Sequence, residues 1–129
     1  MKNAMTAVLA SAVLAGCASR GEKFRPEAVA GDQAAIYVYR TGGGWGSVRV
    51  VIDQQDAADL RSGEYIVRIV KPGEHLVRAE GSSIMARTAS LVPGDAAYFE
   101  VSKGMGGLAL NVPEESVARR KIAGSSKVP

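Results

Sequence analysis

EYIVRIVKPGEHLVRAE, residues 64–80, contains two strand patterns on either side of Pro72-Gly73. The first half is mostly β-branched and aromatic, which is typical of strands, and the second half continues the theme. Proline holds φ near about −65° at the first centre of a type II turn, and glycine takes the positive φ that the second centre needs. The stretch therefore predicts a strand, a tight turn and a second strand.

The same combination of turn and strand recurs along the middle of the chain. Ser62-Gly63 and Pro93-Gly94 also stand directly before strand patterns, which indicates a meander of hairpins. Short strands separated by frequent turns are typical of sandwiches and small barrels. We predict an all-β fold, a small antiparallel β-sandwich within residues 34–112. Its expected strands are residues 34–40, 47–53, 64–70, 74–80, 84–92, 96–102 and 107–112.

The C-terminal region has the pattern of a short helix over residues 113–123. Pro113 suits the first helical position, acidic residues follow it in the first turn, and basic residues occupy the last turn. Gly124 suits the position after the helix. We expect an apolar side of this helix to lie against the sheet, and residues 124–129 to form a loose tail. That side would consist of Val117, Ala118 and Ile122.

The N-terminal region has the pattern of an export signal. Lys2 provides a positive start, residues 4–14 carry no charge and are mostly apolar, and small residues follow. A comfortable membrane-spanning helix needs about 20 apolar residues, and this run is shorter. We therefore predict a signal peptide at residues 1–16, with a buried core helix as the alternative.

Leu14-Ala15-Gly16-Cys17 resembles the lipobox of bacterial lipoproteins. The resemblance implies cleavage between Gly16 and Cys17, a diacylglycerol on the Cys17 sulfur and an acyl group on its new amino group. Two or more acyl chains give a stable membrane anchor. Ala18 rather than Asp after the cysteine implies the outer membrane, by analogy with Gram-negative sorting. Residues 17–33 mix charges, Gly and Pro, and we expect them to form a flexible tether.

Composition limits how the domain can be stabilised and which partners it can bind. The chain has 129 residues, a net charge of +3 and a single cysteine, which the lipid would use. The domain is therefore expected to hold together by packing, without a disulfide. Basic and acidic residues are interleaved, which gives nucleic-acid binding little support. The basic cluster at residues 119–121 is interpreted as a solvated helix end, with contact to an anionic lipid or polymer as the alternative.

The middle of the chain resembles the small bacterial lipoproteins that carry domain-of-unknown-function family 2846. The resemblance covers residues 34–112 and implies the fold and the envelope location, but it implies no activity. One position departs from the pattern, because Gln54 stands where the turn after Ile52-Asp53 usually has glycine. The Pro-Gly-x-His step is also similar to that of PEGA-type surface sandwiches. The matching residues are Tyr37–Arg40, Val51–Asp53, Leu60, Gly63, Tyr65, Pro72, Gly73, His75, Gly94, Tyr98 and Phe99.

Few residues carry a signal for catalysis or metal binding. His75 is the single histidine. One interpretation makes it a general base or metal ligand, and the other makes it a structural residue whose ring caps the turn before it. No G-x-S-x-G nucleophile motif accompanies it. Asp53, Asp56 and Asp59 loosely resemble a calcium loop but lack its alternate spacing, central glycine and terminal Glu. We therefore predict no catalytic residue, no metal site and no cofactor besides the lipid.

The glycine-rich stretch TGGGWGS, residues 41–47, contains the single tryptophan, Trp45. A phosphate-binding loop would need a Gly-Lys-Ser/Thr ending and a following helix, so nucleotide binding is not expected. Trp45 either folds back onto the sheet edge or stays exposed and contacts a glycan, a protein partner or a membrane. Met105, which stands between glycines, is expected at a hairpin tip.

These observations favour a lipid-anchored envelope protein that acts as a non-enzymatic binding or assembly module, with Trp45 as its candidate partner contact. Two alternatives remain open. One is a small periplasmic hydrolase or carbohydrate-active enzyme, which would need a pocket with converging acids or a His–acid pair. The other is a purely structural envelope protein with a featureless surface.

We expect Cys17→Ser to release the protein from membranes or to leave its signal uncleaved, because serine cannot accept the diacylglycerol. Membrane fractionation and the mass of the N-terminal peptide measure both effects. Ser19→Ala, a nearby change outside the motif, should alter neither. Normal processing and unchanged fractionation of Cys17→Ser would refute the anchor.

Overall fold

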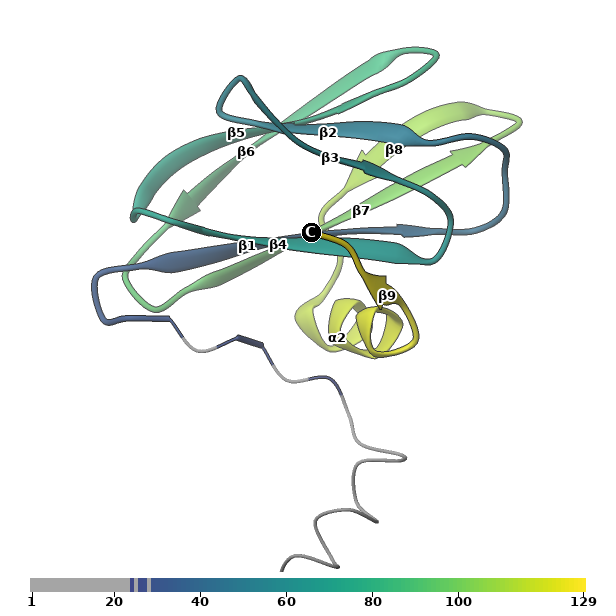
Figure 1. Ribbon diagram of the computed structural model, residues 1–129. Coiled ribbons are helices and arrows are strands. Elements are labelled where there is room, and N and C mark those ends of the chain that lie inside the picture. The colour runs from purple at the N-terminus through teal and green to yellow at the C-terminus, as the bar shows by residue number, and fades with distance from the viewer. Residues whose placement is uncertain (1–23, 25, 28) are drawn as a thin grey trace, which may run out of the picture.

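The computed structural model describes residues 24, 26, 27 and 29–129, so that the predicted signal peptide and the first part of the predicted tether lie outside the described residues (Figure 1). Two sheets face each other and a short helix covers the outer side of one of them. The strands are β1 (Ala34–Thr41), β2 (Val48–Ile52), β3 (Gln55–Leu60), β4 (Glu64–Val70), β5 (Gly73–Glu80), β6 (Ile84–Leu91), β7 (Ala96–Gly104), β8 (Gly107–Asn111) and β9 (Ser126–Lys127).

The prediction of an all-β fold is confirmed, but the sandwich is not purely antiparallel. One sheet has the strand order β8-β7-β1-β4-β9 and the other has the order β3-β2-β5-β6. Strand β7 runs parallel to β1, and β9 runs parallel to β4. Backbone hydrogen bonds from Ala35 to Asp95 and from Gly94 to Gln33 place the start of β7 beside the start of β1. Strand propensity carries no information on pairing direction, so the sequence could not show this.

The expected meander of hairpins is wrong, because the three glycine turns change sheets. The turns at Gly63, Gly73 and Gly94 join β3 to β4, β4 to β5 and β6 to β7, and each of these pairs is divided between the two sheets. All three glycines have positive φ, as the turn chemistry predicts. The hairpins are β2–β3, β5–β6 and β7–β8. Strand β3 was not expected, since its sequence QDAADL has low strand propensity.

Strand β1 is buried on both faces, which explains its almost continuous apolar sequence. One row of its side chains, which includes Ile36 and Val38, packs between the sheets in the main core. The opposite row, which includes Tyr37 and Tyr39, packs under the helix with Tyr98. This central position makes β1 the strand through which the two apolar layers are connected.

The helix α2 (Glu115–Ala123) begins two residues later than expected, after Glu114, and ends at Gly124 as predicted. Ala118 and Ile122 are buried against the tyrosines of the sheet, which confirms two of the three residues of the expected apolar side. The third, Val117, is only half-buried and lies outside this cluster. The last residues are not a loose tail. The N–H groups of Ser126 and Val128 donate to the carbonyls of Gly63 and Tyr65, which adds β9 to the edge of the sheet.

The described part of the predicted tether packs onto the domain instead of standing free. The Phe24 ring lies edge-on to Tyr37 and Tyr65, at centroid distances of 5.4 and 6.1 Å. The Glu27 N–H donates to the Tyr37 hydroxyl at 2.6 Å, and Lys127 pairs with the Glu27 carboxylate at 2.5 Å. Aromatic contacts of this kind are worth about 0.5–1.5 kcal/mol each beyond their burial, so Phe24 is part of the folded unit.

Three arginines join the two sheets by donating to main-chain carbonyls. Arg40 of β1 donates to Leu60 of β3 at 2.9 Å, and Arg68 of β4 donates to Ala57 of β3 at 2.5 Å. On the opposite edge, Arg87 of β6 donates to Leu110 of β8 at 2.9 Å. These bonds cross from sheet to sheet at the edges and at one end of the sandwich.

We expect Gln54→Gly to stabilise the fold by about 1 kcal/mol, because the β2–β3 turn holds two residues with positive φ. Asp53 has φ 52° and Gln54 has φ 67°, the combination that a two-residue type I′ turn needs and that glycine adopts without strain. Urea denaturation measures the change.

Gly63→Ala is the matched control for this effect. Gly63 has φ 82° and an added Cβ would meet no atom within 4 Å, so its cost of about 1 kcal/mol reports backbone strain alone. A destabilised Gln54→Gly variant would contradict the type I′ reading of the turn.

Candidate functional site

One end of the sandwich carries the two glycine-rich segments of the sequence side by side. Residues 42–47 connect β1 to β2, and residues 103–107 contain the end of β7, the hairpin turn and the start of β8. The Lys103 ammonium donates to the carbonyl of Trp45 at 3.1 Å, which ties the two segments together. We call residues 42–47 and 103–107 the tip.

Side chains from three different elements hold the carbonyls of the first segment. Besides Lys103, the Arg40 guanidinium donates to the Gly46 carbonyl at 2.9 Å, and the Ser62 hydroxyl donates to the Gly42 carbonyl. Gly44 has φ 121°, and an added Cβ there would come within 3.2 Å of Arg40 Nη2. Only glycine therefore fits this place without a shift, and the segment has a defined path despite its composition.

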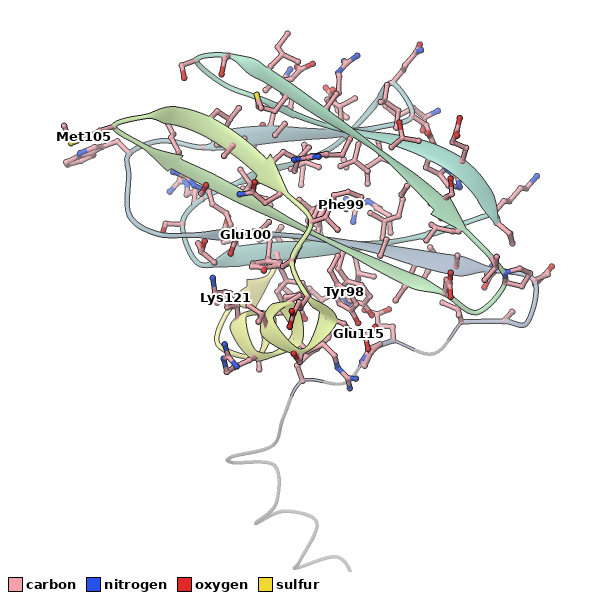
Figure 2. The ribbon with its side chains drawn as sticks, turned by 180° about the vertical axis from the view of Figure 1, so that it is seen from behind. Tyr98, Phe99, Glu100, Met105, Glu115 and Lys121 are labelled. Carbon is pink, nitrogen blue, oxygen red and sulfur yellow. The ribbon has the colours of Figure 1, made fainter. Side chains whose placement is uncertain are left out.

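The tip displays two large apolar side chains to solvent. Trp45 is 92% exposed and Met105 is fully exposed at the end of the β7–β8 hairpin (Figure 2). The predicted hairpin tip at Met105 is thus confirmed, and the alternative in which Trp45 folds back onto the sheet edge is wrong. Its flanking glycines give the ring no side chains to pack against, whereas tryptophan in a core is framed by strand residues.

Arg40 lies directly beneath the tip and is fully buried. Its Nη1 reaches the carbonyls of Gly46 and Leu60, while its Nε and Nη2 have no hydrogen-bond partner among the described residues. Sequence reasoning did not single out this residue. The available signal was a charged side chain on the inward row of an otherwise apolar strand, where an unpaired charge is costly.

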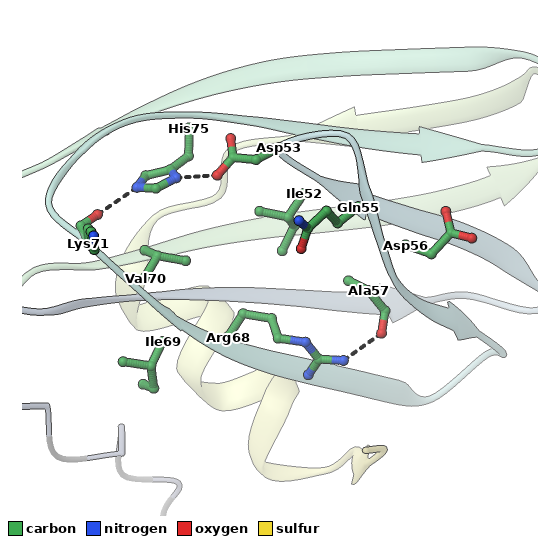
Figure 3. Close-up of a pocket in the computed structure, with 10 residues that line it drawn as sticks. All are labelled: Ile52, Asp53, Gln55, Asp56, Ala57, Arg68, Ile69, Val70, Lys71 and His75. Atoms are coloured by element: carbon green, nitrogen blue, oxygen red, sulfur yellow. Dashed lines mark hydrogen bonds and ion pairs between the residues drawn. The ribbon is translucent and has the colours of Figure 1, made fainter.

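A second candidate region lies between the β2–β3 hairpin and β4, where a pocket of about 540 Å³ opens (Figure 3). Here His75 Nδ1 lies 2.5 Å from Asp53 Oδ2, and His75 Nε2 lies 2.6 Å from the carbonyl oxygen of Lys71. The other oxygen of Asp53 accepts the N–H of Leu76 at 2.9 Å. The structure thus brings His75 together with Asp53, a pairing that the sequence analysis missed because the two stand in separate turns.

Both ring nitrogens of His75 face oxygen acceptors, so the doubly protonated imidazolium satisfies both contacts and the neutral ring only one. The hydrogen bond to Asp53 raises the pKa of His75 above its ordinary value, against the effect of burial, with help from the Lys71 carbonyl. Burial alone would raise the pKa of Asp53, but the bonds from His75 and Leu76 lower it overall. The pair is therefore an ion pair that closes a turn.

This arrangement offers little for acid–base or nucleophilic catalysis. The nitrogen that would face a nucleophile, Nε2, is taken by a carbonyl, and a histidine held as imidazolium is a poor general base. The residues that line the pocket include no serine, threonine or cysteine. They are Ile52, Asp53, Gln55, Asp56, Ala57, Arg68, Ile69, Val70, Lys71 and His75.

The spaced aspartates do not converge on one point. Asp53 holds His75, whereas Asp56 and Asp59 both face Arg49, at 3.7 and 3.4 Å. Within residues 24, 26, 27 and 29–129, no group of three or more His, Cys, Asp or Glu side chains is placed to hold a metal ion.

The basic cluster of α2 makes ion pairs with its surroundings. Arg119 lies 3.6 Å from Glu115 one turn earlier, and Lys121 lies 2.8 Å from Glu100 of β7 (Figure 2). Gly16 and Cys17, the predicted cleavage and lipidation residues, lie outside the described residues.

No protein-family model matches this chain, and no curated protein matches it. Across the part of the chain that the structure describes, no helix is both long and apolar enough to cross a bilayer.

We expect the His75–Asp53 pair to stabilise the fold most between about pH 3.8 and 6.5. The pKa of His75 is raised, so its contribution is complete below its ordinary 6.5 and is lost as the pH rises through the raised value. The pKa of Asp53 is lowered, so its contribution is complete above 3.8 and is lost as the pH falls through the lowered value. Urea denaturation across this range measures the profile.

His75→Gln should cost about 0.5–2 kcal/mol at pH 6 and should remove the decline on the alkaline side. Gln55→Ala, a neutral change in the same pocket, should leave the shape of the pH profile unchanged. Parallel profiles for His75→Gln and the unaltered protein would show that the pair contributes nothing.

Proposed function

We propose that this chain is a lipid-anchored envelope protein whose folded domain is a binding module, and that it binds through the tip. The single observation that carries the proposal is the exposure of Trp45 and Met105 on two loops that are tied together and held from below. Isolated exposed apolar residues are common, but two large ones on adjoining, glycine-flanked loops form a contact surface.

The hydrogen bonds beneath the tip support binding because they lower its cost. A free, flexible loop loses conformational entropy when it docks, whereas a loop already held in one path loses less. Arg40, Ser62 and Lys103 supply that restraint through carbonyls, and none of the three covers the Trp45 ring. Large aromatic side chains are also the residues that most often dominate binding energy.

The envelope location rests on the sequence alone. The lipobox-like Leu14–Cys17 behind an apolar run supports attachment of lipid to Cys17, and Ala18 supports the outer membrane. The resemblance to the family 2846 lipoproteins supports the same location. A folded unit that includes Phe24 fits a domain carried close to its anchor.

A second function, that of a small hydrolase, is favoured by one observation: the His75–Asp53 pair lines a pocket. The occupied Nε2 and the lack of a hydroxyl or thiol in the lining count against it. The alternative of a purely structural protein is disfavoured by the exposed apolar tip, because solvent-exposed tryptophan contributes nothing to packing. The binding module therefore accounts for more of the surface.

We expect Trp45→Ala to leave the free energy of unfolding nearly unchanged and to reduce binding to isolated envelopes several-fold. The assay uses the mature chain, residues 17–129, with Cys17→Ser, so that binding depends on the folded domain and not on lipid. Sedimentation with washed envelopes measures bound protein, and thermal denaturation measures stability.

Two matched variants separate binding from folding in this experiment. Leu60→Ala, in the core, should lose about 2–5 kcal/mol of stability. Val92→Ala, an exposed apolar residue in the β6–β7 connection at the opposite end, should change neither stability nor binding. Equal envelope binding by Trp45→Ala and Val92→Ala would remove the tip as the binding surface.

A further inference from the structure

We propose that the ligand of the tip is the lipid–water interface of the membrane to which the protein is anchored, so that Trp45 and Met105 form a second membrane contact beside the lipid. This inference rests on the proposed function and specifies the partner of the same surface. It follows from the chemistry of the tip, from its charge and from its distance to the anchor.

The side chains of the tip suit a bilayer interface better than a glycan or a protein. Apart from Trp45 and Met105, the tip consists of glycines, Ser47 and Lys103. A glycan site needs several side chains that donate or accept hydrogen bonds, and a protein interface needs a polar rim around its apolar centre. A membrane interface needs neither, because the tryptophan ring sits at the level of the headgroups with its apolar part toward the acyl chains and its N–H toward water.

The charge of the tip also favours a membrane as its ligand. Lys103 is the only ionisable residue of the tip, and it is positive. The charges around the tip balance in pairs, and Arg61 of the β3–β4 turn stands beside Glu64 at the start of β4. Near Ser47, Arg49 pairs with Asp59, and Arg78 pairs with Glu80. A single lysine near an anionic membrane surface is attracted to it, and an acidic residue at the tip would oppose approach. The tip carries no such residue.

The anchor can reach the plane of the tip. Phe24 packs on Tyr65, which lies opposite Tyr39 in the β1–β4 register, and the tip begins three residues after Tyr39. Met105 lies five residues beyond Glu100, the β7 partner of Tyr39, and five strand residues span about 17 Å. The seven residues from Cys17 to Phe24 can extend up to about 25 Å, which exceeds that distance. Lipid on Cys17 and the tip can therefore contact one bilayer at the same time.

The two contacts would reinforce one another. Two side chains alone bind a membrane more weakly than an acylated chain does, because binding scales with the apolar area that enters the interface. Once the lipid holds the domain at the surface, the second contact becomes intramolecular and its effective concentration is high. The tip would then fix the orientation of the domain on the membrane.

The test uses the tryptophan itself, because Trp45 is the only one in the chain and all tryptophan emission reports it. The lipidated protein is reconstituted into vesicles of phosphatidylethanolamine and phosphatidylglycerol. We expect its emission to lie at shorter wavelength than that of the unlipidated mature chain in buffer. Brominated acyl chains should quench it, and acrylamide should quench it several-fold less than in buffer.

Met105→Asp should reverse these changes, because a carboxylate at the hairpin turn opposes entry into an anionic interface. Val92→Asp adds the same charge at the opposite end of the sandwich and should leave the emission of the vesicle-bound protein unchanged. Emission that stays at long wavelength and open to acrylamide in correctly lipidated protein would overturn the membrane contact.

The outcomes distinguish this inference from the proposed function. A Cys17 without lipid, seen by mass spectrometry, would refute the anchor. Protein that binds washed envelopes through Trp45 but ignores lipid vesicles would overturn the membrane contact and leave the binding module in place, with a glycan or protein as its ligand. A protein that binds neither washed envelopes nor lipid vesicles would refute the tip as a binding surface.

Discussion

The fully buried guanidinium of Arg40 is the constraint on which the end of the sandwich depends. Removing a charge from water is costly unless hydrogen bonds replace the lost solvent, and here the carbonyls of Leu60 and Gly46 do so for Nη1. One of them belongs to the opposite sheet and the other to the loop above. The same side chain therefore sets how the sheets meet and where the loop runs. Arg68 and Arg87 make comparable contacts at the two edges.

The two candidate regions differ in what they leave available to a ligand. The His75–Asp53 pair satisfies its own polar atoms within the protein, so the geometry explains a stable turn better than a reaction. At the tip the carbonyls of Gly42, Trp45 and Gly46 accept hydrogen bonds. The apolar side chains of Trp45 and Met105 are not covered. Exposed apolar surface has a free-energy cost in water that a second surface can relieve. For this reason the tip, and not the pocket, is the candidate site for ligand binding.

Much of the fold could be predicted because local patterns determine it. Each of these patterns lies within a short stretch of sequence and determines the structure of that stretch. They are the apolar run of β1, the glycine turns and the order of charges in α2. Pairing direction and the change of sheet at each turn depend on contacts between distant strands, so they could not be read locally. Strand β3 lacks a propensity signal because it is a polar edge strand, and its two exposed aspartates suit an edge that must not pair further.

The candidate site was predicted only in part, for a similar reason. Trp45 and Met105 were each recognisable as unusual within their own loops, but nothing in either loop indicated that Lys103 joins them. Asp53 and His75 were each noted for different reasons, and only the cross-strand contact makes them one unit. Buried polar residues such as Arg40 are hardest to interpret from sequence, because their partners are main-chain carbonyls, which every residue has.

The parallel pairing of β1 with β7 has a consequence for the order in which the chain can fold. Residues of β1 find their partners in the last third of the chain, with Ala35 opposite Ala96, and β4 is completed only by β9. Folds dominated by such distant pairings form slowly, because a large loop must close before its contacts form. The central strand thus has β4 on one side but lacks its other neighbour until β7, residues 96–104, has been synthesised. A chain with this topology therefore completes its first sheet only when the C-terminal strands β7, β8 and β9 are available.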